Sequence, residues 1–305
     1  MKPRFGVNYV PSRDWWYAWL DWDGARVRDD LNAIAAIGMD HVRVHCVWPY
    51  FQPNMTRVNR SAVRALIDLH EAADEAGLDV SVSVLDGWLS GFAFEPAWMR
   101  KTATDGRRNM FTDPLAVAAE KVLFAELAVA VGRHPRFLGF DLGNELGVMT
   151  HFGHEAEGAD MDAWQADMLE HCRLLAPDRW HVNGVDHAHW FHGRGFGRGA
   201  LATAGSATAL HCWTLFTEAS TRFGVMAPES LRLAEYMAEL SRAYATDPDR
   251  PIWIQEFGCS SQWLPSDEIP EFAERTMRHA LDCANLWGFT WWCSHDLDPG
   301  LVGFH

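Results

Sequence analysis

The sequence predicts one (β/α)8 TIM barrel of the α/β class spanning residues 1–305. Short β-rich runs alternate with helical segments along the whole chain, and there are eight such runs. The runs are continuously apolar, as expected for parallel strands buried on both faces. An open doubly wound sheet is the alternative, but no G-x-G-x-x-G or phosphate-binding loop follows any run.

The first half of the chain contains four predicted strands, each followed by a helical segment. The strands are 5–10, 41–48, 79–85 and 137–144, and the helices are 24–37, 60–76, 114–131 and 160–175. Gly38 and Gly77 are placed to stop the first two helices. Asp113 and Pro114 form an N-cap and first-turn pair at the start of the third.

The second half of the chain completes the predicted barrel. Its strands are 180–185, 209–214, 252–257 and 288–293, and its helices are 229–245 and 268–286. The fifth strand is followed by a loop rich in glycine and histidine with little helical pattern. Only twelve residues follow the eighth strand, so the last helix is predicted to be missing or truncated.

Composition and charge exclude several classes of partner. The net charge is −15, from 26 basic and 41 acidic side chains, and this field repels nucleic acid and anionic membranes. No apolar run approaches the ~20 residues of a membrane helix, and the N-terminus lacks the apolar core of a signal peptide. Six cysteines without C-x-x-C spacing favour free thiols in a reducing cytoplasm. We therefore expect a cytoplasmic protein.

Two glutamates end predicted strands in similar contexts. Glu145 follows the fourth strand in FLGFDLGNELG, and Glu256 closes the seventh in PIWIQEFG. In such a barrel both lie on the C-terminal face, where reactive groups gather. A carboxyl pair is what glycosidic cleavage needs, since one group donates a proton while the other attacks or activates water. The alternative is that each is an ordinary loop carboxylate.

These motifs carry a resemblance that spans essentially the whole chain. GNE at 143–145 and QEFG at 255–258 resemble the acid/base and nucleophile motifs of the retaining TIM-barrel glycoside hydrolases of clan A. Arg43 on the second strand, His211 on the sixth and Trp292 on the eighth are similar to residues of glycoside hydrolase family 5. The resemblance implies that Glu145 is the acid/base and Glu256 the nucleophile.

One position departs from the pattern of this family. The family commonly has a tyrosine two positions after the strand-six histidine, whereas this chain has Trp213. An indole N–H can donate a hydrogen bond, but tryptophan has no hydroxyl. Whether Trp213 makes the hydrogen bond that the tyrosine usually makes to the nucleophile is therefore an open question. Arg43 could keep Glu256 ionised, or it could form a structural ion pair. Asn144 could bind a sugar hydroxyl, or it could satisfy its own turn.

Tryptophan is unusually frequent, with 16 residues against five tyrosines. Many follow predicted strands, where flat indole faces suit the C–H faces of sugar rings. Besides Trp213 and Trp292, we expect Trp48 and Trp88 to bind sugar, and at least half of the loop tryptophans to pack onto the barrel. The clustered loop histidines lack any H-E-x-x-H or comparable spacing, so no metal and no cofactor are expected.

The leading functional hypothesis is a retaining β-glycosidase that acts on oligosaccharides through Glu145 and Glu256. Large loops at 11–24 and 186–199 could close the barrel mouth into a pocket that selects chain ends or short oligosaccharides. The run WCS at 292–294 resembles clan members that act on β-mannosides, so β-mannoside is favoured over β-glucoside. An endo-acting β-mannanase or β-glucanase, a metal-dependent barrel enzyme and a non-catalytic carbohydrate-binding barrel are the alternatives.

Overall fold

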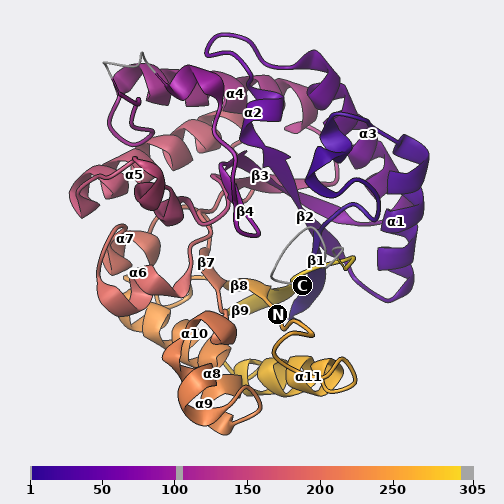
Figure 1. Cartoon of the computed structure of the whole chain (residues 1–305), viewed down its shortest axis with the longest axis vertical. Coiled ribbons are helices and arrows are strands. Elements are labelled where there is room, and N and C mark those ends of the chain that lie inside the picture. The colour runs from indigo at the N-terminus through magenta and orange to yellow at the C-terminus, as the bar shows by residue number, and fades with distance from the viewer. Residues whose placement is uncertain (1, 101–105, 297–305) are drawn as a thin grey trace.

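Seven parallel strands form the sheet at the centre of the computed structural model, which describes residues 2–100 and 106–296. Their order across the sheet is β6-β3-β2-β1-β9-β8-β7. The strands are β1 (Arg4–Tyr9), β2 (His41–Val47), β3 (Asp79–Asp86), β6 (Phe137–Asp141), β7 (Thr208–His211), β8 (Ile252–Phe257) and β9 (Leu286–Trp291). Helices surround this curved sheet (Figure 1), as predicted for a (β/α)8 barrel.

The predicted fifth strand, 180–185, closes the ring between β6 and β7 but forms only two isolated bridges. Val182 pairs with Asp141 of β6, and Val185 pairs with Leu210 of β7. Space limits the residue type here, since a β-carbon on Gly184 would lie 2.1 Å from Gln255 Oε1. The segment therefore joins the barrel with little regular strand structure, which corrects the sequence-based expectation.

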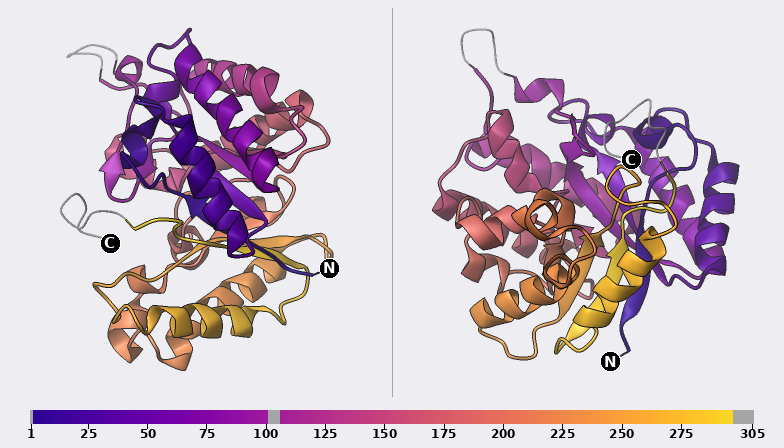
Figure 2. Two further views of the ribbon diagram at one scale, coloured as in Figure 1. Left: turned by 90° about the vertical axis from the view of Figure 1, so that its right-hand side faces the viewer. Right: turned by 60° about the horizontal axis from the view of Figure 1, so that its bottom comes forward.

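Six longer helices pack around the sheet, and their ends follow from local chemistry. They are α1 (Gly24–Ala36), α3 (Arg60–Ala76), α4 (Pro114–Val131), α5 (Gly158–Leu175), α10 (Leu233–Tyr244) and α11 (Ile269–Ala280). The Asp113 carboxylate accepts a hydrogen bond from the Leu115 N–H at 2.9 Å, which confirms the predicted cap. Gly77 ends α3 in the left-handed region. Figure 2 shows α1 and α3 side by side on one flank.

Several short elements that were not predicted lie at the C-terminal ends of the strands. Helix α9 (Pro228–Leu231) is not one of them, because it lies in the predicted helix 229–245, which the structure divides into α9 and α10. The elements that were not predicted are the 3-10 helices η1 (Trp15–Trp19), η3 (Leu146–Phe152) and η4 (Thr214–Phe216), the hairpin β4 (Trp88–Leu89) and β5 (Phe92–Ala93), and the helices α6 (His187–His192), α7 (Arg198–Leu201) and α8 (Glu218–Phe223). The glycine- and histidine-rich loop therefore contains two helices. These elements build the rim of the barrel mouth.

The boundaries of the last helix and the last strand differ from the prediction. Helix α11 ends at Ala280 rather than near 286, and β9 begins at Leu286. No helix follows β9 among the residues described up to Asp296, where the eighth helix of a full barrel would begin. Across the described parts of the chain, none of the helices has the length and apolar character needed to cross a bilayer.

Candidate active site

A cavity of about 790 Å³ lies at the C-terminal ends of the strands. Loops that follow β3, β6, the 180–185 segment, β7, β8 and β9 all contribute to its wall. Both predicted glutamates line it, together with Asn144, Trp88, Trp213 and Trp292. The structure therefore brings together six of the nine residues that the sequence singled out for the site.

The backbone around Glu145 is shaped to present this side chain to the cavity. Glu145 has φ 47° and ψ 48°, in the left-handed region that non-glycine residues seldom occupy, and it precedes η3. The flanking glycines allow the close packing of this turn. A β-carbon on Gly147 would lie 1.8 Å from His189 Nε2, and one on Gly143 would lie 2.8 Å from the Leu85 carbonyl oxygen.

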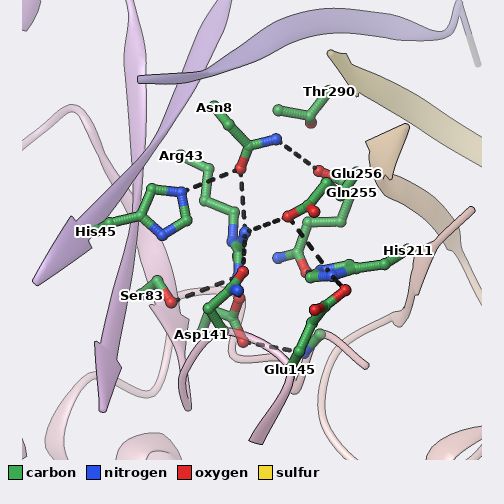
Figure 3. A network of polar contacts seen from close by, with 12 residues as sticks. Asn8, Arg43, His45, Ser83, Asp141, Glu145, His211, Gln255, Glu256 and Thr290 are labelled. Atoms are coloured by element: carbon green, nitrogen blue, oxygen red, sulfur yellow. Dashed lines mark hydrogen bonds and ion pairs between the residues drawn. The ribbon is translucent and has the colours of Figure 1, made fainter. Parts of the chain in front are cut away.

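His211 stands between the two glutamates (Figure 3). Its Nδ1 atom lies 3.0 Å from Glu145 Oε1 and 3.5 Å from Glu256 Oε2. One oxygen of each glutamate and one nitrogen of His211 all fall within 4.8 Å of one another. His211 is fully buried, and burial lowers the pKa of its imidazole. A neutral ring with its proton on Nδ1 can donate to either carboxylate.

Arg43 occupies the centre of a buried polar network, as Figure 3 shows. Its strongest partner is Asp141 of β6, whose Oδ2 lies 2.8 Å from Nη2 and 2.9 Å from Nε. Arg43 Nη1 also donates to Glu256 Oε2 at 3.2 Å and to Asn144 Oδ1 at 3.0 Å. Arg43 therefore forms a buried ion pair with Asp141 and also contacts Glu256, while its role in keeping Glu256 ionised stays a prediction.

The two glutamates differ in the donors that surround them. Glu256 Oε2 accepts a hydrogen bond from Arg43, and Glu256 Oε1 accepts one from the Trp213 indole N–H at 2.6 Å. Among the described residues, the side-chain donor to Glu145 is His211, through Nδ1. Donors to a carboxylate favour its charged form, so this geometry favours ionisation of Glu256 over that of Glu145.

Electrostatics around Glu145 favour its protonated form. Burial, together with the Asp186 carboxylate, raises the pKa of Glu145 to about 8, although Arg43 opposes the rise. Burial also raises the pKa of Glu256, but His211, Arg43 and the Trp213 N–H all lower it, while Glu145 adds to the rise. Pairs of carboxyl groups in unlike environments are how acid and base roles are separated at one site.

Several buried polar residues of this network were not identified from the sequence, among them Asn8, His45, Asp86 and Asp141. Asp86 accepts hydrogen bonds from the Asn144 N–H at 2.7 Å and from His45 Nδ1 at 2.9 Å. Asn8 Oδ1 accepts from Arg43 Nη1 at 3.0 Å. The available signal was charge inside an apolar strand, because a buried charge needs a partner.

The tryptophans divide into a cavity group and a packing group. Trp88, Trp213, Trp263, Trp291 and Trp292 line the cavity. Trp48 does not: it is fully buried, and its N–H donates to Gln52 Oε1 at 3.0 Å. This placement departs from the expectation that Trp48 contacts sugar. It follows from the position of Trp48 as the first residue of a short helix, α2 (Trp48–Phe51), which packs into the core.

The loop after β1 supports the cavity from behind. Trp16 is buried against Trp292 and His45, with ring centroids 6.1 and 5.3 Å apart, and Trp15 packs on Phe92 of the hairpin. From the loop after the 180–185 segment, Asp186 and His187 reach the cavity wall. Of the two loops predicted to enclose the cavity, the one at 11–24 therefore packs behind residues of the cavity wall, and the one at 186–199 contributes to the wall itself.

Comparison with known proteins identifies the family. No family model and no curated protein sequence matches the chain. A GH5_18 protein from Streptomyces cattleya, solved in complex with Manβ1-4GlcNAc, is 40% identical, with a TM-score of 0.93 over 99% of this chain and 74% of that one. A GH5_18 protein from Bifidobacterium longum subsp. infantis is 41% identical, with the same TM-score over 100% and 72%. The chain belongs to the GH5_18 glycoside hydrolases.

A more distant structure agrees with this GH5_18 barrel in fold. An exo-β-1,4-mannosidase from an Opitutaceae bacterium is 23% identical, with a TM-score of 0.76 over 95% of this chain and 52% of that one. The two GH5_18 structures, at 40% and 41% identity, confirm the resemblance to family 5, and the protein is a glycoside hydrolase. In this GH5_18 enzyme the cavity that holds Glu145 and Glu256 is the candidate active site.

Proposed function

We propose that this enzyme is an exo-acting retaining β-mannosidase that cleaves short β-mannosides, with Manβ1-4GlcNAc as a candidate substrate. The observation that carries the proposal is the placement of Glu145 and Glu256, with one oxygen of each within 4.8 Å of the other in a single cavity. Retaining enzymes hold their carboxyl groups about 5–5.5 Å apart, whereas inverting enzymes leave about 6.5–9.5 Å for a water molecule.

In the first step Glu256 acts as the nucleophile and Glu145 as the acid. The Glu256 carboxylate attacks the anomeric carbon and forms a glycosyl ester, while the Glu145 carboxyl gives its proton to the departing glycosidic oxygen. Arg43 and Trp213 hold the Glu256 carboxylate from two sides. The raised pKa of Glu145, to about 8, keeps the proton available near neutral pH.

In the second step the roles of Glu145 reverse. Its carboxylate takes a proton from a water molecule, and the resulting hydroxide equivalent displaces Glu256 from the sugar with net retention of configuration. Trp292, immediately after β9, offers an indole face at the cavity wall for the mannosyl ring. Asn144 is fixed by Arg43 and by its donation to the Trp88 carbonyl at 3.1 Å, so its amide is ready to meet a hydroxyl.

The preference for short substrates rests on the wall of the cavity and on the relatives. The β4–β5 hairpin and the loops after the 180–185 segment, β7 and β8 surround the two glutamates. A surrounded site admits a chain end more readily than the interior of a polymer. The Streptomyces cattleya GH5_18 structure was solved in complex with Manβ1-4GlcNAc, which supports a β-mannoside as substrate here.

The test compares 4-nitrophenyl β-mannoside, 4-nitrophenyl β-glucoside, Manβ1-4GlcNAc and long manno-oligosaccharides. We expect release of mannose from the disaccharide and of single mannose units from chain ends, with the β-anomer appearing first by NMR. Glu256→Gln should abolish turnover, and EDTA should leave it unchanged. Random internal cuts would instead favour an endo-acting enzyme, activity on glucosides alone would reject the mannoside, and sugar binding without turnover would reject catalysis.

A further inference from the structure

Trp213 occupies the position where this family commonly has a tyrosine, yet it reaches the proposed nucleophile. It lies two residues beyond His211, the last residue of β7, and immediately before η4. Its indole Nε1 donates to Glu256 Oε1 at 2.6 Å, a short charge-assisted hydrogen bond. The sequence left open whether an indole could make this bond, and the structure shows that it does.

Gly258, two residues after Glu256, leaves the room that the indole needs. A β-carbon at this position would lie 3.0 Å from Trp213 Cη2 and 3.3 Å from Cζ3, and also 2.6 Å from the Trp292 carbonyl oxygen. Gly258 does not have a positive φ, so other residues could adopt its backbone conformation. The requirement for glycine here is therefore steric.

The indole is bounded on its other sides by aromatic rings. Trp292 meets it edge to face with ring centroids 6.5 Å apart, and Phe216 lies 5.6 Å away at a tilted angle. With Gly258 beneath its outer edge, the ring has little freedom to turn. Its N–H is thus held in line with Glu256 Oε1, while Arg43 holds the other oxygen.

We propose that Trp213 and Gly258 form one positioning unit for Glu256, in which the bare α-carbon of Gly258 admits the indole and the indole N–H fixes one carboxylate oxygen. The unit replaces a phenol, which ionises near pH 10, with a donor that does not ionise. The proposal rests on the proposed role of Glu256 as nucleophile. It assigns a functional role to Gly258 that depends on the absence of a side chain.

The first test is a double-mutant cycle on kcat/KM. Trp213→Phe keeps an aromatic ring but removes the N–H and the outer edge that lies over Gly258, and a loss of about tenfold to hundredfold is expected. Gly258→Ala should cause a similar or larger loss, because the added methyl group would press on the Trp292 carbonyl oxygen as well as displace the indole. The double variant should lose much less than the product of the two single losses, because both act on one bond. Independent, multiplying losses would overturn the proposal.

The second test uses the pH dependence of kcat/KM, which reports the free enzyme. Removal of a donor to the carboxylate should move the acidic limb to higher pH in Trp213→Phe and in Gly258→Ala, and Trp213→Tyr should bring it back. Trp263→Phe, which removes another cavity indole, should leave that limb in place. The other titratable groups against Glu256 stay unchanged in all variants: Arg43, Glu145, His211, Cys212 and Cys293. An acidic limb that does not move in Trp213→Phe would overturn the proposal.

A third readout does not depend on turnover. The indole N–H signal of Trp213, identified in NMR spectra by its loss in Trp213→Phe, should shift in Gly258→Ala and in Glu256→Gln. A signal unmoved by Gly258→Ala would reject the positioning unit, even in an enzyme that cleaves the predicted substrate. A wild type without glycosidase activity would reject the proposed function, and this signal would still decide whether the unit exists.

Discussion

His211 Nδ1 lies 3.0 Å from Glu145 Oε1, so the proposed acid/base residue and the histidine that ends β7 form a direct pair. The same nitrogen lies 3.5 Å from Glu256 Oε2. Because burial lowers the pKa of His211, the ring offers one hydrogen to two carboxylates. That hydrogen can serve Glu256 while Glu145 is protonated, and serve Glu145 once the proton has left.

Removal of this shared donor should therefore impair both steps of the reaction. We expect His211→Phe to lower kcat by about tenfold to hundredfold, the range for a hydrogen bond to a charged group. Single-turnover and steady-state kinetics on an aryl β-mannoside would separate glycosylation from deglycosylation. His192→Phe, at the exposed last residue of α6, is the control and should change neither step. A defect confined to one step would show that the hydrogen serves only one glutamate.

The two glutamates should respond differently to an external nucleophile. Glu145→Ala should retain glycosylation on substrates with good leaving groups, and azide should restore its turnover by attacking the glycosyl ester without base assistance. Glu256→Ala should lose turnover by several orders of magnitude and form no glycosyl ester on Glu256. Azide products and their anomeric configuration can be followed by NMR. The opposite behaviour of the two variants would reverse the assignment.

Arg43 should matter for both the pH profile and the fold. Its positive charge lowers the pKa of Glu256, so Arg43→Met should raise that pKa and move the acidic limb of kcat/KM to higher pH. The same change leaves Asp141 buried without its cation, which typically costs about 3–5 kcal/mol of stability. Thermal unfolding and pH–rate profiles measure the two effects separately.

A matched pair of variants separates these two roles of Arg43. Arg43→Lys keeps a charge but loses the planar fork that joins Asp141 and Glu256, so it should restore part of the acidic limb and little of the stability. Arg60→Met removes an exposed arginine paired with Glu126 and should change neither property. If Arg43→Met unfolds early but keeps its acidic limb, Arg43 serves the fold alone.

The alternation of apolar runs and helices was sufficient to predict the barrel, because each unit buries its own face locally. The departures arise where tertiary contacts override local pattern. Helix α11 stops at Ala280 because the chain turns there, and Asn285 takes a left-handed conformation while donating to the Pro248 carbonyl at 2.6 Å. The 180–185 segment has the sequence pattern of a strand, yet it pairs with β6 and β7 only through two isolated bridges.

The site was predictable where chemistry meets the end of a strand. Glu145 and Glu256 stand out because an apolar run ends on each, and the structure places both in one cavity. Asp141 was missed because its partner, Arg43, is 98 residues away in the sequence, and only the folded barrel brings them together. The place of Trp213 against Glu256 likewise depends on Gly258, which no local pattern indicates.

Glu120 offers a test of the buried electrostatics away from the active site. It lies fully buried on α4, with Oε2 accepting the Trp164 N–H at 2.9 Å, and burial raises its pKa to about 8. Between about pH 4.5 and 8 the folded state therefore holds a proton that the unfolded chain has released. The contribution of Glu120 to the free energy of unfolding therefore falls as pH rises through this window.

Glu120→Gln should remove this contribution, because the amide never ionises and its oxygen can still accept from Trp164. Relative to the wild type, the variant should lose less stability between pH 5 and pH 8. Glu126→Gln, on the same helix but paired with Arg60 near the surface, is the control and should follow the wild type. Denaturant unfolding at the two pH values measures the difference. If the free energy of unfolding changes equally with pH in Glu120→Gln and in the wild type, Glu120 is ionised in the folded protein.

Asp186 gives the sharpest prediction about the acid. It lines the same cavity as Glu145, and its negative charge adds to the rise that burial causes in the pKa of Glu145. Asp186 also caps α6, since its Oδ1 accepts the Ala188 N–H at 2.9 Å. Asp186→Asn removes the charge but keeps an oxygen that can cap the helix, and asparagine is as good an N-cap as aspartate.

The variant should lower the pKa of Glu145, so that its catalytic proton is lost at lower pH. The alkaline limb of kcat/KM should then move to lower pH, while the acidic limb, which reports the nucleophile, should stay in place. Asp162→Asn is the matched control, because Asp162 also accepts a backbone N–H, that of Gly197 at 2.8 Å, but lies outside the cavity wall. An alkaline limb that is the same in Asp186→Asn and wild type would show that burial alone keeps Glu145 protonated.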